Sequence, residues 1–405
     1  MIAIGDARQV VLDLCPLLAA ELTTCEDICG RVLAQDVVAS ENVPPFANSA
    51  VDGFAVRAVD VAEVPCELYV IGTLAAGAAS SFTLGVREAV RIMTGAPIPD
   101  GADAVVMVED SEKIDSDHVR LTRKARHMQA IRAEGSDVRI GDVVFAAGSV
   151  LNAPGAGVLA SVNARKVLAY RRARVALLST GDELVTDGSP LRPGQIRESN
   201  LTMLASMIEA TGCSVVNLGV IADDEKLLEK TLRDATLRCD AIVTSGGVSM
   251  GDFDIVKTVL SRIAQMKWMQ LAIKPAKPFA FGQLTSADGR TIPIFGLPGN
   301  PVSSLVSYEL LARPALRKMM GHTQDLLRPT VRAIVDAPLD RKTDGKIHYI
   351  RVFGSFCPDG RLHVRDTGPQ GSHQLAATAL ANGLAVVPDG GGVSVGGEVD
   401  VMLWA

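Results

Sequence analysis

The sequence lacks the cysteine and histidine patterns of a structural metal site. Its 405 residues include seven cysteines and six histidines, but no two cysteines are spaced as CxxC and the histidines are scattered singly. Cys25 and Cys29 are close in the sequence, yet nothing nearby supplies the remaining ligands of a zinc site. Most of the cysteines lie among apolar residues, which is typical of buried free thiols in a reducing compartment.

The sequence also lacks a basic run and an uninterrupted apolar segment. Its net charge is -6 and its pI about 5.6, so no basic stripe is present to follow the phosphates of a nucleic acid. The first residues include Asp6 and Arg8 and do not resemble a signal peptide. Residues 143–164 are uncharged, but glycines and a proline interrupt them, which argues against a transmembrane helix. We therefore expect a cytoplasmic protein with no nucleic-acid or membrane partner.

Three glycine-containing loops are the most informative segments that are present. They are STGDEL at 179–184, SGGVSMGD at 245–252 and GLPGNP at 296–301. Apolar runs rich in β-branched residues, at 175–178, 215–221 and 241–244, are typical of strands that are buried on both faces of a parallel sheet. Because the carboxyl ends of parallel strands share one edge, we expect the three loops to converge on one crevice.

Helices are expected between these strands. Asn200 is a candidate N-cap for a helix that stops at Gly212, and Asp224 is a candidate N-cap for the next helix. A third helix is expected from about Asp254, and Asn300 precedes a proline that fits the first position of a fourth helix. With further strands at 268–273 and 291–295, residues 173–321 form a complete α/β domain.

The loop chemistry indicates a phosphate site that also holds a metal ion. Backbone N–H groups of Ser245, Gly246 and Gly247 are suited to an anion near a helix start, and Lys274 and Lys277 add positive charge. The same region contains Asp182, Glu183, Asp223, Asp224, Asp252 and Asp254. So many acids beside a phosphate imply a hard cation such as Mg²⁺ between them. Asp182 and Asp224 have simpler explanations as a turn cap and a helix cap.

Further motifs lie within this domain and on both sides of it. They are PPF at 44–46, VDGFAVR at 51–57, RIMTGAP at 91–97, EGSD at 134–137, IKPAKPF at 273–279 and GSH at 371–373. Together with the three loops, and in this order, they resemble the MoeA-type molybdopterin molybdenumtransferases, the family that includes the gephyrin E domain. A single glycine-rich string recurs by chance, whereas this series over about 400 residues does not.

The resemblance implies a multidomain α/β and β fold, and the length of 405 residues with 48% apolar residues also suggests two to four domains. Residues 1–47 and 136–172 would form one discontinuous N-terminal domain, which opens with an amphipathic helix around residues 7–18. Residues 48–135 would form a β-barrel-like insert. A central parallel-sheet α/β domain of the molybdopterin-binding type would span 173–321, and a C-terminal β domain would span 328–405.

The resemblance also implies a reaction and its residues. The substrates would be adenylylated molybdopterin and molybdate, the products would be the molybdenum cofactor and AMP, and Mg²⁺ would assist. The catalytic candidates are Glu183, Asp223, Asp254, Asp252, Lys274, Lys277, Asp52 and Thr94, of which Glu183, Asp223 and Asp254 would bind the metal. The substrate-binding candidates are Ser245, Gly246, Gly247, Pro298, Gly299, Asn300, Pro301, Ser303, Arg351 and Ser372.

The same resemblance implies a homodimer. Asp52, Thr94, Arg351 and Ser372 would complete the site across domains or subunits. Further partners would be a molybdopterin adenylyltransferase and the apoproteins of molybdoenzymes.

Three positions depart from the family pattern. Ala276 replaces a glycine, Phe54 replaces a tyrosine and Asp252 replaces a glutamate. If position 276 requires a positive φ, alanine costs roughly 1 kcal/mol relative to glycine.

Two alternatives stay open at this point. A scaffold or molybdopterin-binding protein of the same fold would need no catalytic acids. A molybdopterin adenylyltransferase shares the sheet domain but lacks the motifs around Asp52 and Thr94, and this chain has both.

Overall fold

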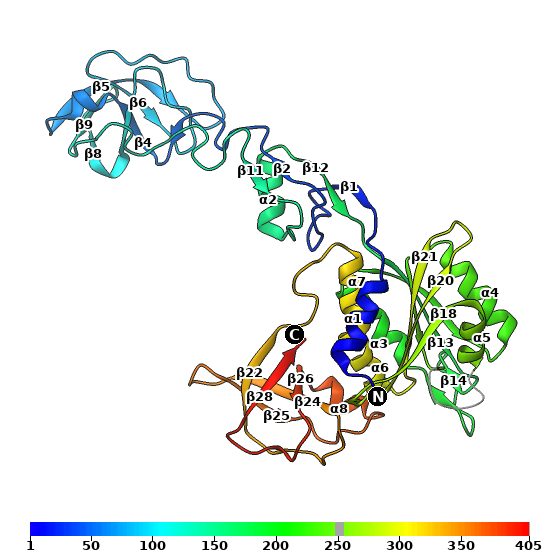
Figure 1. Ribbon diagram of the computed structural model, residues 1–405. Coiled ribbons are helices and arrows are strands. Elements are labelled where there is room, and N and C mark those ends of the chain that lie inside the picture. Colours follow the sequence, from blue (N-terminus) through cyan, green and yellow to red (C-terminus); the bar gives the residue numbers. More distant parts are fainter. Residues whose placement is uncertain (248–254, 405) are drawn as a thin grey trace. The chain divides into compact units, whose positions relative to one another are not determined.

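The computed structural model describes residues 1–247 and 255–404, so the candidate acids Asp252 and Asp254 lie outside the described residues. The chain divides into two compact units (Figure 1). Unit 1 comprises Met1–Glu21, Gly30–Ala34 and Ala169–Ala405, and unit 2 comprises Leu22–Cys29 and Gln35–Leu168. Among the helices of the described residues, none combines the length and the apolarity needed to cross a membrane.

Unit 1 is built around a six-stranded sheet. Its strand order is β16 (Ser214–Ile221), β13 (Arg174–Thr180), β17 (Ala241–Ser245), β21 (Thr291–Leu297), β20 (Pro278–Thr285) and β18 (Gln265–Gln270). The first four strands are parallel, as predicted, and the last two are antiparallel to their neighbours. A tight turn, in which Ser286 N donates to Arg290 O, joins β20 to β21. A connection this short permits only an antiparallel pair.

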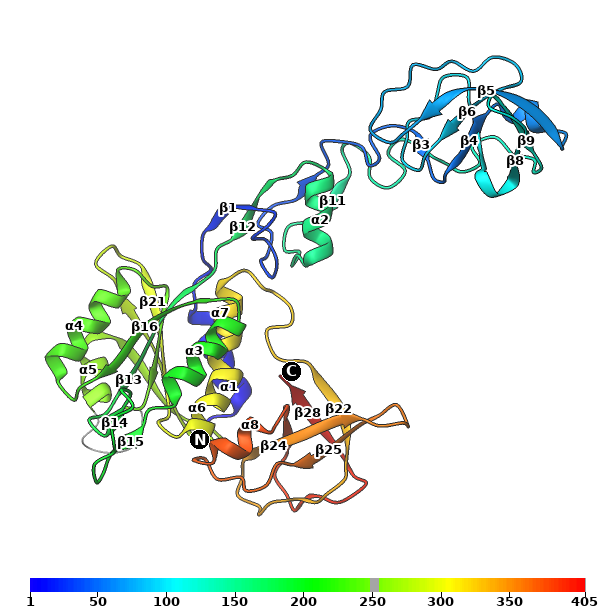
Figure 2. The ribbon, with the colours of Figure 1, turned by 180° about the vertical axis from the view of Figure 1, so that it is seen from behind.

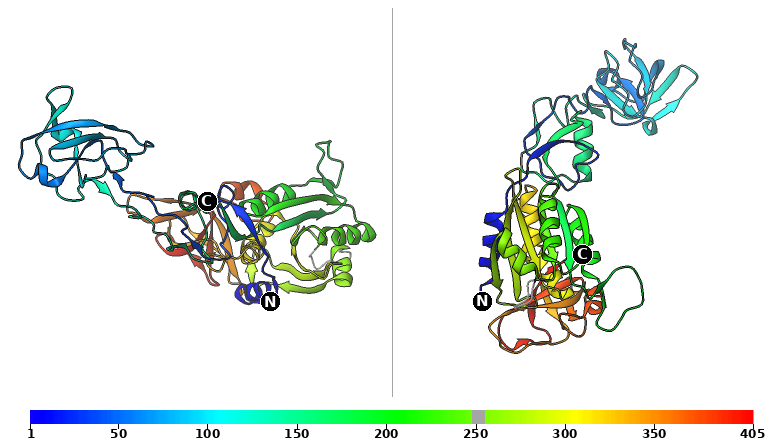
Figure 3. Two further views of the ribbon diagram at one scale, coloured as in Figure 1. Left: turned by 90° about the horizontal axis from the view of Figure 1, so that it is seen from above. Right: turned by 90° about the vertical axis from the view of Figure 1, so that its right-hand side faces the viewer.

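Helices cover both faces of this sheet, and each face has its own apolar core. They are α1 (Ile4–Leu14), α3 (Asn200–Ala210), α4 (Glu225–Thr236), α5 (Ile255–Ile263), α6 (Pro301–Ser307) and α7 (Arg313–Met319). Figures 1 and 2 show α4 and α5 on one face, and α1, α3, α6 and α7 on the other. Figure 3 shows the same layers from two further directions. A π-helical segment, Tyr308–Ala312, joins α6 to α7.

Two helix starts and one helix end test the sequence prediction. Asp224 caps α4 as predicted, since its carboxylate accepts from the N–H groups of Lys226 and Leu227. The prediction that Asn200 caps α3 is wrong: Asn200 is the first helical residue, and the Glu198 carboxylate accepts from Leu201 N. The first helix ends at Leu14 rather than near residue 18, because Cys15 precedes Pro16 and takes an extended conformation.

The C-terminal part of unit 1 is a closed barrel. Its strands pair in the ring order β24 (Ile347–Phe356), β25 (Leu362–Asp366), β22 (Thr330–Val335), β28 (Glu398–Leu403) and β26 (Gly383–Val387), which pairs again with β24. The short strand β19 (Ile273–Lys274) pairs with β24 in parallel. The predicted strand at 268–273 is therefore divided between two sheets. Its first part stays in the α/β sheet as β18, and its end joins the barrel. The helix α8 (Leu375–Ala379) precedes β26.

Unit 2 contains the β-rich insert that the sequence predicted. Its six-stranded sheet has the order β7 (Ala104–Met107), β4 (Gly53–Val56), β6 (Glu88–Ile92), β5 (Cys66–Leu74), β9 (His118–Leu121) and β8 (Ser111–Lys113). Apolar clusters lie on both faces of the sheet. The unit also contains two-stranded pairings of β3 (Asn48–Ser49) with β10 (Ile131–Arg132) and of β2 (Val37–Val38) with β11 (Val143–Phe145), followed by α2 (Ala153–Ser161).

Candidate functional site

The first cavity lies at the carboxyl ends of three parallel strands. The register pairs Ser179 with Ser245 and Ser245 with Leu297, so the ends of β13, β17 and β21 lie side by side. The described parts of the three predicted loops therefore converge, and they line a cavity of about 600 Å³. Its lining includes Ser179, Thr180, Glu183, Glu198, Asn200, Ser245, Gly246, Gly247, Pro298, Gly299, Asn300, Pro301 and His373.

Asn200 connects two of these loops. It is buried, and its Nδ2 donates to Ser245 Oγ at 2.7 Å and to the Gly299 carbonyl at 2.8 Å. Its Oδ1 is buried and has no hydrogen-bond partner among the described residues. Because the Glu198 carboxylate accepts from Leu201 N at the start of α3, the Asn200 side chain is not needed as a cap. It holds the SerGlyGly and GlyLeuProGlyAsn loops at a fixed spacing instead.

The SerGlyGly loop differs in one respect from the prediction. Gly246 and Gly247 have φ values of 91° and 74°, which a residue with a Cβ rarely adopts. The Gly246 N–H is not directed at an anion, because it donates to the Leu297 carbonyl at 3.0 Å. This bond is a second tie between the loops after β17 and β21.

Carboxylates gather beside the first cavity. Asp223 N donates to Asp182 Oδ1 at 3.2 Å. Burial raises the pKa of Asp223 above its ordinary value, and the nearby negative charges of Asp182 and Glu183 raise it further. Repulsion of this kind is relieved by a hard divalent cation, so the oxygen donors fit Mg²⁺ in their chemistry. Within residues 1–247 and 255–404, however, no three His, Cys, Asp or Glu side chains are already arranged as a metal site.

A second cavity of about 710 Å³ lies between the α/β sheet and the barrel within unit 1, and Pro278 lines both cavities. Lys274, Lys277, Ser303 and Ser372 line this second cavity rather than the first. Lys274 lies there because β19 is not part of the α/β sheet and pairs with β24 instead. Lys277 follows three residues later in the same segment. The sequence placed these lysines at the same crevice as the SerGlyGly loop, whereas the structure places them in the adjoining cavity.

Ala276 lies between the two lysines in a left-handed conformation. Its φ is 72° and its side chain is buried. The condition under which alanine is costly here is therefore met, and the family's glycine would adopt this conformation without strain.

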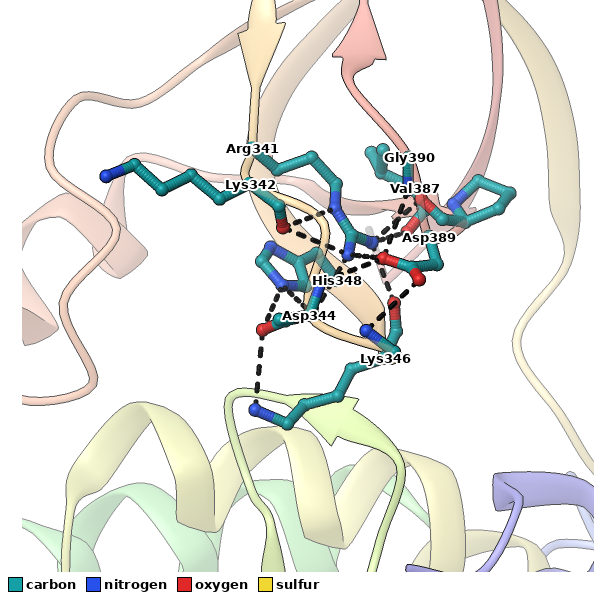
Figure 4. Close-up of polar contacts among 10 residues, drawn as sticks. Arg341, Lys342, Asp344, Lys346, His348, Val387, Asp389 and Gly390 are labelled. Atoms are coloured by element: carbon teal, nitrogen blue, oxygen red, sulfur yellow. Dashed lines mark hydrogen bonds and ion pairs between the residues drawn. The ribbon is translucent and has the colours of Figure 1, made fainter.

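A network of charged side chains forms one wall of the second cavity (Figure 4). The Arg341 side chain is fully buried, and it donates to Asp344 Oδ1 at 2.9 Å and to Asp389 Oδ1. It also donates to the carbonyls of Lys342, Lys346, Val387 and Pro388. Asp344 in turn contacts Lys346 Nζ at 3.3 Å and His348 Nε2 at 3.2 Å. Arg341 thus holds the 342–346 loop against the end of β26.

Arg351 lines neither cavity. It is 1% exposed, and its guanidinium donates to the carbonyls of Pro369 at 2.6 Å and Gly371 at 3.1 Å. The next residue in that loop, Ser372, accepts from Val302 N at the start of α6 through its carbonyl. Arg351 therefore shapes the loop that presents Ser372.

Comparisons with known proteins cover the whole chain. Residues 2–163, 176–318 and 337–404 match, respectively, the MoeA N-terminal region (domain I and II), the probable molybdopterin binding domain and the MoeA C-terminal region (domain IV). A molybdopterin molybdenumtransferase of Haemophilus influenzae is 37% identical over 403 residues, which are 99% of this chain and 98% of that protein. This chain belongs to the MoeA family.

Two further relatives agree with this membership. Molybdopterin molybdenumtransferase 2 of Mycobacterium tuberculosis is 36% identical over 402 residues, which are 96% of this chain and 96% of that protein. The crystal structure of a molybdopterin biosynthesis MoeA protein from Pyrococcus horikoshii is 28% identical, covers 100% of both chains and has a TM-score of 0.80. The similarity to MoeA proteins therefore extends over the full multidomain chain.

The MoeA N-terminal region contains the remaining candidates, Asp52 and Thr94, which lie in unit 2. Asp52 Oδ1 accepts from Thr94 N at 2.7 Å and from Thr94 Oγ1 at 2.9 Å. These two hydrogen bonds, the backbone one first, lower the pKa of Asp52. Asp52 and Thr94 therefore form one local pair.

Several residues that line the cavities of this MoeA-family chain were missed from the sequence. Glu198 accepts from Ser179 Oγ at 3.1 Å, and Asn200 ties two loops. The capping pattern at the start of α3 predicts bonds to the backbone and does not predict these side-chain contacts. Arg341 and His348 gave no sequence signal, because their role depends on a cavity between two parts of unit 1 that are distant in sequence.

Proposed function

We propose that this chain inserts molybdenum from molybdate into adenylylated molybdopterin and releases AMP, with Mg²⁺ assisting. The observation that carries the proposal is the pair of adjoining cavities in unit 1. One has carboxylates and glycine loops, and the other has lysines and hydroxyl groups. The relatives' names describe molybdenum transfer, and this pair of cavities provides separate places for a phosphorylated substrate and for an oxyanion.

In this proposal the first cavity receives the phosphate-bearing part of the adenylylated substrate. Ser245, Gly247 and Thr180 offer hydroxyl and backbone donors, and the loop from Pro298 to Pro301 forms the opposite wall. Donors fixed in advance stabilise charge that develops on phosphate oxygens without reorganisation during the reaction. Asn200 and the Gly246 N–H keep the two walls in register.

Glu183 and Asp223 are the described residues that would hold Mg²⁺, together with Asp254, and Asp252 would support them. When bound, the ion supplies positive charge at the phosphoanhydride. An oxygen from water or molybdate would bond to phosphorus as the P–O bond of the anhydride breaks, and AMP would leave with the negative charge on the oxygen of its phosphate. The raised pKa of Asp223 fits this arrangement, since its causes are burial and the nearby carboxylates of Asp182 and Glu183.

The second cavity is proposed to bind molybdate. Lys274 and Lys277 supply positive charge, and the hydroxyl groups of Ser303 and Ser372 supply donors for a tetrahedral oxyanion. Arg351 positions Ser372 through the Pro369 and Gly371 carbonyls instead of contacting the oxyanion.

The remaining elements of the proposal come from the family alone. We infer a homodimer in which Asp52 and Thr94 complete the site of another domain or of the partner subunit. The adenylyltransferase and molybdoenzyme apoproteins are the inferred protein partners, and the cytoplasm is the inferred compartment. The four-domain division at 1–47 with 136–172, 48–135, 173–321 and 328–405 is finer than the two observed units and is part of the same proposal.

The proposal is tested by AMP release from adenylylated molybdopterin with Mg²⁺, with and without molybdate. Release that depends on molybdate supports it, and Glu183→Gln should slow that release by about 100-fold because a fixed charge at the phosphates is lost. Glu209→Gln, on the exposed side of α3, is the matched control and should not change the rate. Binding of substrate without release would favour a scaffold or binding protein instead.

A further inference from the structure

His348 is a histidine in the wall of the proposed molybdate cavity. It is 8% exposed, and the register of β19 and β24 pairs its Cα with that of Lys274. Neighbouring residues on paired strands direct their side chains to the same face of a sheet. His348 and the oxyanion-binding lysine are therefore immediate neighbours.

Three elements lie against His348, and two of them contribute charges that face it. The 341–346 loop contributes Asp344, at 3.2 Å from Nε2 through both carboxylate oxygens, together with Arg341 and Lys346, which both contact Asp344. Strand β19 contributes Lys274. From β26 the register partner of His348 is the uncharged Val387, and Asp389 beyond it is bound to Arg341 (Figure 4).

Without a ligand, this environment favours neutral imidazole. Burial lowers the pKa of His348; the hydrogen bond to Asp344 raises it, and Arg341 and Lys274 lower it, so the pKa lies below the ordinary value. Burial alone would raise the pKa of Asp344, but hydrogen bonds from His348 and Lys346 lower it to about 2. Asp344 therefore stays ionised near neutral pH and does not take up a proton there.

We infer that the second cavity takes up one proton, at His348, when a dianionic oxyanion binds beside Lys274. A dianion at this place offsets the positive charge of Lys274 and adds negative charge near the imidazole. Both effects favour the imidazolium form of His348. This form donates from Nε2 to Asp344 and carries one more ring proton than the neutral form. The proton comes from solvent, and no bond other than N–H is formed. This inference rests on the proposed molybdate site and adds its pH dependence.

Linkage sets the size of the effect. When a protein takes up one proton as a ligand binds, the affinity falls tenfold for each unit by which pH rises between the pKa values of the titrating group in the free and bound states. We therefore expect molybdate to bind more tightly at about pH 6 than at about pH 8, the range in which histidine titrates, by a factor of up to about 100, the limit for one proton over two pH units.

The experiment is calorimetric titration of the full chain with molybdate in two buffers that differ in ionisation enthalpy. The difference in heat gives the number of protons taken up, with no variant needed. Uptake that approaches one proton at the lower pH supports the inference. Molybdate binding with no uptake and equal affinity across the range would overturn it while leaving the proposed function intact. Absence of molybdate binding would overturn both.

Three histidine variants locate the proton. His348→Gln keeps a donor for Asp344 and cannot become charged, so uptake should disappear and the affinity should stay near the wild-type value at the higher pH. His363→Gln, whose ring contacts Asp336 and Asp359 elsewhere in the barrel domain, should keep the uptake. His373→Gln, in the wall of the first cavity, should keep it as well. Loss of uptake in either control, with His348→Gln unchanged, would contradict the inference.

A measurement on the wild-type chain guards against an unfolded variant. The ring C–H resonances of the histidines, followed by NMR against pH with and without molybdate, report each pKa directly. One buried histidine should titrate at a higher pH when molybdate is present. Identical titration curves in both conditions would also overturn the inference.

Discussion

Asn200 is the residue whose removal most directly tests how the first cavity is held together. Asn200→Ala deletes the donor to Ser245 Oγ and the donor to the Gly299 carbonyl, at 2.7 and 2.8 Å. Each hydrogen bond contributes about 1 kcal/mol net, and the buried Ser245 hydroxyl left without this donor costs about 1–3 kcal/mol, of which part is already counted in the lost bond. We therefore expect the free energy of unfolding of unit 1 to fall by about 2–4 kcal/mol.

The assay is urea unfolding followed by tryptophan fluorescence. Both tryptophans of the chain, Trp268 and Trp404, lie in unit 1, so the signal reports this unit alone. With a urea dependence of about 2 kcal/mol per molar, the midpoint should fall by about 1–2 M. AMP release should slow in native conditions too, because the two loops lose their common anchor.

Asn217→Ala is the matched control. Asn217 lies in the same unit and is exposed, and its Oδ1 accepts a local hydrogen bond from Gly219 N at 2.9 Å. Its loss should shift the free energy of unfolding by less than about 1 kcal/mol. If Asn200→Ala and Asn217→Ala have equal midpoints and wild-type rates of AMP release, Asn200 does not hold the two loops.

Three other predictions concern strain and titration. Ala276→Gly should stabilise unit 1 by up to about 1 kcal/mol, because relief of the left-handed alanine exceeds the gain in freedom of the unfolded chain; a loss of more than about 1 kcal/mol in urea unfolding would contradict the strain. The lowered pKa of Asp52 contributes stability that is present above the unfolded pKa and lost as pH falls through the folded one, so Asp52→Asn should flatten the acid side of the melting temperature plotted against pH. The pKa shift of Asp223 has the opposite sign. Its contribution to stability is complete below the unfolded-state pKa and is lost as pH rises through the folded-state pKa. Asp223→Asn should remove that loss from the same plot of melting temperature against pH. Mg²⁺ should therefore raise the wild-type melting temperature more at about pH 8 than at about pH 5, and less in Asp223→Asn; an equal rise in both proteins would remove Asp223 from the metal site.

The sequence was sufficient for the elements around the first cavity. The apolar runs at 175–178, 215–221 and 241–244 identify strands that are buried in a parallel sheet, and such strands leave strong local patterns. The glycines after β13 and β17 identify the turns that follow these strands, because Gly181, Gly246 and Gly247 have positive φ. Asp224 as a helix cap was also predictable, because the cap, its helix and its acceptor geometry are local.

The sequence was not sufficient where contacts join distant segments. Asn200 fits an N-cap pattern, and only the packing of α3 against the ends of β17 and β21 shows that its side chain is used elsewhere. Lys274 and Lys277 appeared to share a crevice with Ser245, but the pairing of β19 with β24 moves them to the adjoining cavity. Arg351 was grouped with substrate-binding residues, and it is buried beneath the loop of Ser372.

The measurement that tests the account most directly is the rate of AMP release as a function of molybdate concentration, in the wild type and in Lys277→Ala. We expect release to depend on molybdate in the wild type, and Lys277→Ala to need about 10 to 100 times more molybdate, because one charged contact of about 1.5–3 kcal/mol is lost. Lys230→Ala, exposed on α4, should follow the wild-type curve. Release that is independent of molybdate, or an unchanged molybdate requirement in Lys277→Ala, would contradict the proposed oxyanion cavity.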